Sequence, residues 1–214
     1  MPTITRKTGA LFLVAMLALA TTACVDDLAL PPPAPALSEV IHYWHFNILP
    51  AGPLTSVLAD VTKRAPAEIT YTGTGLGYMD NVDPGSDLNA RNSTLAGLGM
   101  RLRNPANVRQ LIIAAPSTGY RSIVITWAAM RSSTGAIQAE FAYSVDGGTT
   151  WVPAGAPIVI AEVWGLKSVD LKAITAVENN ANLKFRILFS GTGSDGATGN
   201  NRIDNLTVEG IPLI

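Results

Sequence analysis

Apolar residues alternate with polar ones, or form short runs, along most of the chain after residue 38. This spacing predicts β-strands, because the side chains of a strand point alternately to its two faces. Gly, Asn, Asp and Pro, which are common in turns, end the runs. We expect strands at residues 40–47, 69–73, 97–103, 122–131, 137–144, 158–163, 183–190 and 202–210. Only residues 53–64 and 168–177 leave room for a helical turn. The pattern predicts an all-β fold, a sandwich of about 8–10 antiparallel strands.

The first 23 residues follow a different pattern. Arg6 and Lys7 precede about ten apolar residues at 11–20, and small residues follow at 21–23. This arrangement is typical of a secretory signal and is too short for a membrane span, which needs roughly 20 apolar residues. Cys24 follows directly and resembles the acylated cysteine of the lipobox of bacterial lipoproteins. Thr21 stands where that motif usually has leucine, so an ordinary cleaved signal is the alternative.

The lipobox resemblance implies an anchored, extracytoplasmic protein in contact with a lipid bilayer through acylated Cys24. We divide the chain into a lipoprotein signal peptide (1–23), the lipidated cysteine with a Pro/Ala-rich linker (24–37) and a β-sandwich domain (38–214). The linker reads VDDLALPPPAPAL after Cys24, and its prolines predict an extended spacer. Val25 stands where enterobacterial lipoproteins of the inner membrane carry aspartate, which favours the outer membrane, facing the periplasm or the cell surface.

Charge and cysteine content exclude several functions. The chain has 15 basic and 16 acidic residues, and loss of Arg6 and Lys7 with the signal leaves 13 basic residues. The basic residues are scattered singly, which argues against a nucleic-acid partner. Cys24 is the only cysteine, so the sequence predicts neither a disulfide within the chain nor a thiolate metal site.

Four segments together resemble the lectin-like jelly-roll modules of bacterial surface proteins, of the cleaved-adhesin and choice-of-anchor types. The segments are VIHYWHFN at 40–47, SIVITWAAMR at 122–131, FAYSVDGGTTW at 141–151 and NRIDNLTVEG at 201–210. Their order across the domain implies a jelly-roll β-sandwich. In the third segment, the Asp-Gly-Gly turn predicts a hairpin with Trp151 buried on its returning strand.

The same resemblance implies a structural calcium ion where the first and last strands meet. Asp204 matches the family's C-terminal ligand, and Asn47 lies at the matching end of the first strand. The alternative is that Asp204 is satisfied by arginine or by backbone amides, because a buried carboxylate needs a partner. The oxygen-rich stretch at 80–89 lacks the spacing of an EF-hand. It reads as a polar loop whose Asp80, Asp83 and Asp87 are ligand-binding candidates.

Catalytic chemistry has little support in the sequence. His42 and His45, the only histidines, point to opposite faces of a strand and do not form a chelating pair. His42 shares a face with Trp44, which predicts a buried, hydrogen-bonded histidine. A glycoside hydrolase would need two facing carboxylates, drawn from Glu140, Glu162, Glu178 and Asp170.

We therefore interpret the chain as a membrane-anchored, non-catalytic binding module of the adhesin or carbohydrate-binding kind, whose partner is a surface glycan. Tyr71, Tyr78 and Tyr120 lie in or beside predicted loops and are its ligand-binding candidates, whereas the tryptophans are expected in the core. The alternative is an accessory subunit that docks on a larger membrane-protein complex, which the low charge (14%) and the apolar tail at 211–214 also favour. A glycan hydrolase is the third hypothesis.

Overall fold

The computed structural model describes residues 36–213, which form one compact unit. Cys24, the predicted signal and most of the predicted linker lie outside the described residues. Within the described range, no helix is both long and apolar enough to cross a bilayer. The only helical element of that range is the 3-10 turn η1 (Thr175–Val177).

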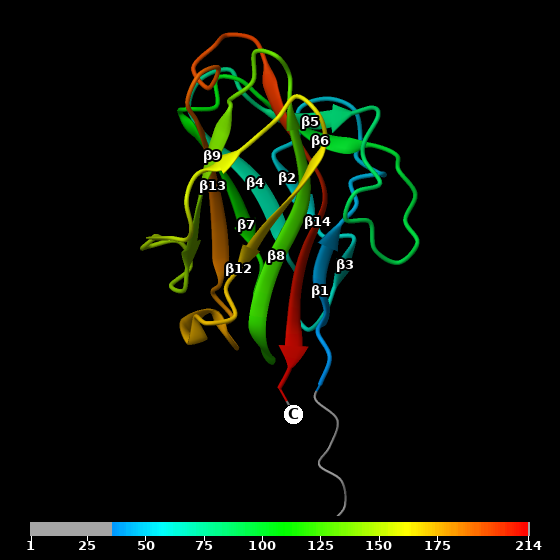
Figure 1. Ribbon diagram of the computed structural model, residues 1–214, viewed down its shortest axis with the longest axis vertical. Coiled ribbons are helices and arrows are strands. Elements are labelled where there is room, and N and C mark those ends of the chain that lie inside the picture. The colour runs from blue at the N-terminus through cyan, green and yellow to red at the C-terminus, as the bar shows by residue number, and fades with distance from the viewer. Residues whose placement is uncertain (1–35, 214) are drawn as a thin grey trace, which may run out of the picture. The chain divides into compact units, whose positions relative to one another are not determined.

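Two antiparallel sheets of seven strands each face one another (Figure 1). Sheet A contains β1 (Glu39–Trp44), β3 (Val61–Thr62), β5 (Met79–Val82), β6 (Gly99–Arg103), β8 (Tyr120–Arg131), β12 (Gly165–Asp170) and β14 (Asn200–Pro212). Sheet B contains β2 (Ser56–Leu58), β4 (Glu68–Gly73), β7 (Arg109–Ala114), β9 (Gln138–Ser144), β10 (Val152–Pro153), β11 (Ile158–Val159) and β13 (Lys184–Ser190). The all-β jelly-roll sandwich predicted from the sequence is therefore confirmed.

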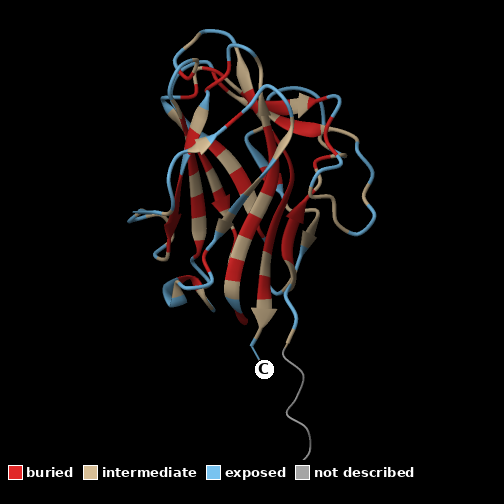
Figure 2. Cartoon of the chain, in the orientation of Figure 1, coloured by how far each residue is buried: buried red, intermediate tan, exposed pale blue. Residues whose placement is uncertain are grey.

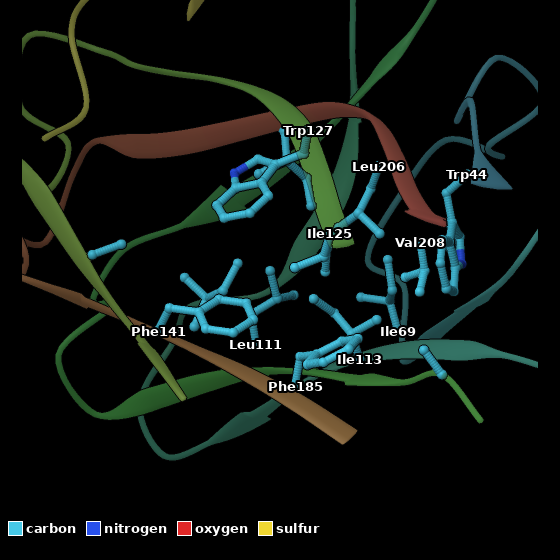
Figure 3. Close-up of a cluster of buried hydrophobic side chains, with 14 of the residues drawn as sticks. Trp44, Ile69, Leu111, Ile113, Ile125, Trp127, Phe141, Phe185, Leu206 and Val208 are labelled. Atoms are coloured by element: carbon cyan, nitrogen blue, oxygen red, sulfur yellow. The ribbon is translucent and has the colours of Figure 1, made fainter. Parts of the chain in front are cut away.

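The core lies between the two sheets and is built from the alternation that the sequence shows. Buried and half-buried residues alternate along β8 and β13, so each strand turns one row of apolar side chains inward (Figure 2). Trp127 stacks on Phe141 of the opposite sheet with 6.2 Å between ring centroids, and Phe141 packs against Phe185 at 5.6 Å (Figure 3). These rings join the two sheets through apolar contact.

The strand β1 is buried on both of its faces. Trp44 and Ile41 are fully buried, and so are their neighbours His42 and Tyr43. The His42 ring donates from Nε2 to the Pro116 carbonyl oxygen (2.8 Å), and its Nδ1 lies 2.8 Å from the Thr62 hydroxyl. The predicted buried, hydrogen-bonded histidine is thus confirmed, and burial lowers the pKa of His42.

Residues 83–98, between β5 and β6, form a long loop that is bonded to the outer face of sheet A through Asn205. The Asn205 amide donates to the carbonyl oxygens of Ser86 (2.7 Å) and Leu88 (3.0 Å), and its Oδ1 accepts from the Tyr43 hydroxyl (2.5 Å). Asn205 has a φ of 47°, at an irregularity in the pairing of β14 with β8. Asparagine tolerates this left-handed conformation better than most residues.

Some elements differ from the sequence-based prediction. Residues 53–64, where a helical turn was expected, form β2 and β3. The strands β5, β7 and β12 were not predicted, and the expected strand at 158–163 shortens to β11; of residues 168–177, where a helical turn was expected, only η1 is helical. Trp151 is half-exposed rather than buried, with the Arg186 guanidinium 4.7 Å from its ring centroid.

We expect Asn205→Ala to loosen the 83–98 loop and to lower the free energy of unfolding by roughly 3 kcal/mol. The change removes three buried hydrogen bonds and leaves alanine with a positive φ. Urea unfolding measures the stability, and trypsin cleavage after the half-buried Arg91 reports on the loop. Asn107→Ala, at an exposed position, is the matched control. Equal stability and equal cleavage in both variants would show that Asn205 does not hold the loop.

Candidate functional site

Five inter-strand loops meet at one end of the sandwich, which we call the loop end (Figure 1). The strand registers fix this arrangement, because the pairs Gly73–Arg109, Asn200–Arg103 and Ser190–Gln138 all lie at that end. The opposite end carries the pairs Glu39–Gly210 and Tyr120–Pro212, and β1 starts there. The loop end therefore lies across the domain from the point where β1 begins. The loops are residues 74–78, 104–108, 132–137, 160–164 and 191–199.

Two adjoining pockets open at the loop end. The first, of about 280 Å³, is lined by Leu76, Tyr78, Arg103, Asn104 and residues 197–200. The second, of about 400 Å³, is lined by residues on the other side of the 191–199 loop, among them Arg131 and Thr134. Thr198 lines both, so the two pockets adjoin across the 191–199 loop.

Asn104 links the loops that line the two pockets. Its side chain is buried, and its amide lies within hydrogen-bond distance of the carbonyl oxygens of Thr134 (3.2 Å), Gly193 (2.6 Å) and Thr198 (2.8 Å). One carboxamide thereby joins three loops. Its Oδ1 has no hydrogen-bond partner among the described residues.

Tyr78 is the aromatic residue of the first pocket, and Arg103 fixes its ring. The Arg103 guanidinium lies 5.1 Å from the Tyr78 ring centroid, in a cation–π contact. Arg103 also donates to Asp80 Oδ2 from Nε (3.0 Å) and Nη2 (2.9 Å). Tyr78 is half-exposed at the pocket, so the structure places this predicted ligand-binding residue where a ligand can reach it.

Asp80 is placed differently from the prediction of a loop residue that contacts ligand. It lies on β5, is buried, and accepts bonds from both Arg101 and Arg103. Burial opposes its ionisation, but the hydrogen bonds from the two arginines outweigh burial and hold the pKa of Asp80 below its usual value. Asp80 therefore positions the arginines. Asp83 and Asp87 are exposed on the 83–98 loop and line neither pocket of the loop end.

Of the three candidate tyrosines, Tyr71 and Tyr120 do not lie on the surface that Tyr78 lines. Tyr71 lies on β4 with its ring in the core, its hydroxyl has no partner among the described residues, and burial raises its pKa. Tyr120 is buried at the end opposite the loop end, where its hydroxyl donates to Glu39 (2.7 Å). A strand residue that points inward is buried even beside a loop, so neither ring is available to stack on a ligand.

Asp204 and Asn47 lie near one another, on either side of a backbone hydrogen bond between Gly85 and Gly97. Asp204 is buried, and its two oxygens accept from the backbone amides of Ser86 (2.6 Å) and Asn205 (2.7 Å). A side chain at residue 85 would collide with this carboxylate, since a Cβ there lies 2.5 Å from Oδ2. Backbone amides, one of the alternatives drawn from the sequence, thus satisfy Asp204.

These donors do not fit a calcium site well. Calcium prefers six to eight oxygen ligands, whereas two N–H groups already point at the Asp204 oxygens. Asn47 donates from its amide nitrogen to the Leu95 carbonyl oxygen (2.9 Å). Among the described residues, no three His, Cys, Asp or Glu side chains are placed to share one ion. We derive no function through calcium, which stays a prediction from sequence.

Several residues at the loop end were not singled out from the sequence. Asn104 gave no signal, because an asparagine before proline is usual in a turn. Arg103 was seen only as one of the scattered charges. Trp164 was expected in the core, but it is half-exposed in the 160–164 loop, and a Cβ at Gly99 would lie 3.5 Å from its ring.

No protein-family model and no curated protein matches the chain. Among solved structures, it is similar to a family 11 carbohydrate-binding module from Clostridium thermocellum in complex with a β-1,3-1,4-mixed-linked tetrasaccharide, with 10% identity and a TM-score of 0.46 over 82% of this chain and 99% of that chain. The K2 cleaved adhesin domain of Lys-gingipain is 10% identical, with a TM-score of 0.43 over 72% of this chain and 97% of that chain.

A third similar structure is the enzymatically active domain of bacteriophage CBA120 tailspike protein 4. It is 12% identical with a TM-score of 0.39, and the match covers 68% of this chain but 19% of the tailspike chain. The chain therefore spans about a fifth of that protein. Similarities at these levels say nothing about what this chain binds or whether it is catalytic.

We expect the stability of the protein to fall as pH rises through the titration of Asp204. Burial raises the pKa of Asp204 to about 7 from an ordinary value of 3.8. The folded state therefore binds more protons than the unfolded state between these pH values, and the carboxyl costs on the order of 4 kcal/mol once it is fully ionised. The stability of Asp204→Asn relative to the wild type should therefore increase from pH 4.5 towards pH 8, as measured by urea unfolding at each pH.

A stability difference that does not change with pH would contradict this assignment. The same measurement at pH 8 with added CaCl₂ or MgCl₂ tests the calcium prediction. From the geometry we expect no calcium-specific stabilisation. A calcium-specific gain that is present in the wild type and lost in Asp204→Asn would establish the site.

Proposed function

We propose that this chain is a non-catalytic binding module that presents its loop end to a glycan while acylated Cys24 holds it on a membrane outside the cytoplasm. The observation that carries the proposal is the pair of adjoining pockets that share Thr198, the first of which is lined by Tyr78. The proposal has three parts, which concern the ligand, the orientation and the absence of catalysis.

The ligand part rests on the chemistry of the pocket lining. Sugars present apolar ring faces edged by hydroxyl groups, and proteins recognise them with aromatic rings and fixed hydrogen-bonding groups. Tyr78 supplies a ring, and Thr198, Asn200 and Asn104 supply hydrogen-bonding groups around it.

The orientation part combines the sequence with the strand order. Cys24 precedes β1 by about fifteen residues, and β1 starts at the end of the sandwich opposite the loop end. The segment that follows Cys24 therefore enters the domain at the end opposite the loop end. This is the orientation that suits a module that binds a surface glycan.

The non-catalytic part rests on the positions of the candidate carboxylates. Glu162 pairs with Arg131 (3.0 Å), and the Glu178 carboxylate accepts from the Ser122 backbone amide (2.8 Å). Asp170 is exposed beside Lys172, and Glu140 is exposed on the outer face of sheet B. Each of these residues has a local role or faces solvent, and hydrolysis would need two of them to face each other across a cleft.

A groove at the side of the sandwich favours the alternative function, docking on a larger complex. The groove holds about 510 Å³ between β12 and the β10–β11 segment, with Tyr143, Ile158, Val169 and Ile174 in its wall. Val159, Val163 and Leu166 are exposed along the same edge of the domain. Apolar exposure of this kind is typical of contacts between proteins. However, Lys167 on β12 opposes edge-to-edge pairing of strands.

We expect Tyr78→Ala to lower the affinity for a bound glycan at least tenfold, because stacking on the ring is lost. The experiment uses the full chain in detergent micelles against a panel of neutral and acidic soluble polysaccharides, followed by isothermal titration of any that bind. Trp151→Ala is the matched control, since Trp151 is the half-exposed aromatic residue on sheet B.

If Trp151→Ala lost binding while Tyr78→Ala kept it, the binding site would lie on sheet B, and the loop-end assignment would be wrong. Failure of the wild type to bind any polysaccharide, together with co-purification of a membrane complex that mutation of Leu166 disrupts, would favour the docking function instead.

We expect Cys24→Ala to release the protein from the membrane fraction, because a chain without the acylated cysteine has no lipid attachment. Fractionation of cells that express each form, followed by detergent phase partition, measures the change. Tyr78→Ala serves as the control, since it should stay with the membrane. A Cys24→Ala protein that remains fully membrane-bound would overturn the lipoprotein prediction.

A further inference from the structure

Three arginines gather on the outer face of sheet A beside the pocket of Tyr78, and we call them the arginine cluster. Arg101 and Arg103 lie on β6, and Arg202 lies on β14. In the register of these strands Arg202 is directly opposite Arg101. Directly opposed residues of an antiparallel pair point to the same face, with their Cβ atoms about 5 Å apart.

One carboxylate serves two of these three guanidinium groups. Arg101 donates to both oxygens of Asp80 (2.8 and 2.7 Å), and Arg103 donates to Asp80 Oδ2 (2.9 and 3.0 Å). Asp80 carries a single negative charge, so Asp80, Arg101 and Arg103 together keep one net positive charge. Arg202 adds a second one, because among the described residues no acidic group lies within ion-pair distance of it.

Arg202 is directed toward the loop end. Its Nε donates to Asn200 Oδ1 (3.0 Å), and its Nη1 lies 3.9 Å from the Met130 sulfur. Asp204 is two residues along the same strand, yet its oxygens accept from backbone amides instead. Arg202 is thus hydrogen-bonded to the neutral Asn200 carboxamide and not paired with the buried Asp204 carboxylate.

This arrangement is unfavourable without a further partner. Like charges directly opposite in a sheet destabilise it, and burial together with the neighbouring Arg101 charge lowers the pKa of Arg202. The excess is local, since the whole chain carries a net charge of −1. An anion at the cluster would remove the repulsion and would gain charge-assisted hydrogen bonds.

The cluster and the Tyr78 pocket are parts of one surface. Arg103 belongs to both, because it stacks on Tyr78 and lines the pocket. Asn200 lines the same pocket and accepts the bond from Arg202. A ligand in the pocket therefore meets the Tyr78 ring and the Arg103 guanidinium, and Arg202 lies next to the lining residue Asn200.

We propose that the glycan bound at the loop end is acidic, and that its carboxylate or sulfate groups bind the arginine cluster with Arg202 as the principal contact. This inference rests on the proposed glycan-binding function and narrows it to one ligand class. Arginine suits this role because its planar fork matches a carboxylate or sulfate in two hydrogen bonds.

The test compares Arg202→Gln with Arg121→Gln, which removes an exposed arginine at the opposite end of the sandwich. The probes are polygalacturonate, dextran sulfate, neutral dextran and poly-glutamate, titrated into the full chain in detergent micelles at two salt concentrations. We expect Arg202→Gln to weaken polygalacturonate or dextran sulfate binding at least tenfold and to reduce its salt dependence, with unfolding stability retained or raised. Arg121→Gln should bind as the wild type does.

The possible outcomes separate the two proposals. Tight binding of neutral dextran that is lost in Tyr78→Ala and kept in Arg202→Gln would support glycan binding and overturn the acidic ligand class. Poly-glutamate binding as tight as that of polygalacturonate would also overturn it, because charge alone would then explain the affinity. Failure of every polysaccharide to bind would overturn both proposals.

Discussion

The burial of β14 on both faces is the constraint on which the rest of this structure depends. Its inward residues Ile203, Leu206 and Val208 belong to the core between the sheets, while Asp204 and Asn205 are covered by the 83–98 loop. A strand covered on both sides must satisfy every polar group that it carries. The Asn205 side chain and the Asp204 carboxylate do this by bonding the loop and its backbone amides. The 83–98 loop thus covers the middle of sheet A. The arginine cluster on β6 and β14 lies beyond this loop, beside the loop end.

The main strands were predictable because their alternation reflects a two-layer core, in which local pattern and tertiary burial agree. β5 was missed because MDNV reads as part of a polar loop, and only its pairing with β6 makes it a strand. Likewise, residues 53–64 become extended by pairing Val57 with Ile69 and Val61 with Tyr43. Such pairings depend on partners elsewhere in the chain, and no local pattern contains them.

The candidate site was less predictable than the fold, for a related reason. Tyr71, Tyr78 and Tyr120 all lie in or beside loops predicted from the sequence, but Tyr71 and Tyr120 point inward from strands whereas Tyr78 lies in a loop. The arginine cluster requires Arg101 and Arg202 to be in register, although about a hundred residues separate them. The sequence resemblance identified Asp204 as important, and its amide partners became evident only once the 83–98 loop was placed. The sequence thus identified candidate aromatic and charged residues, and the arrangement of the strands determined which of them lie together on the surface.

The two charged groups of β14 show how this selection bears on function. Asp204 and Arg202 are two residues apart on one strand, and a mutual ion pair would have relieved the cost of burying each of them. The fold instead gives Asp204 two backbone amides and leaves Arg202 with a neutral amide beside a pocket. A strand that served stability alone would gain by pairing them or by replacing both with apolar residues. Keeping an unpaired arginine next to an aromatic pocket is consistent with a partner that arrives from solvent. The acidic sugar proposed as the partner would place its anionic group on the side of Arg202 and would stack on the side of Tyr78.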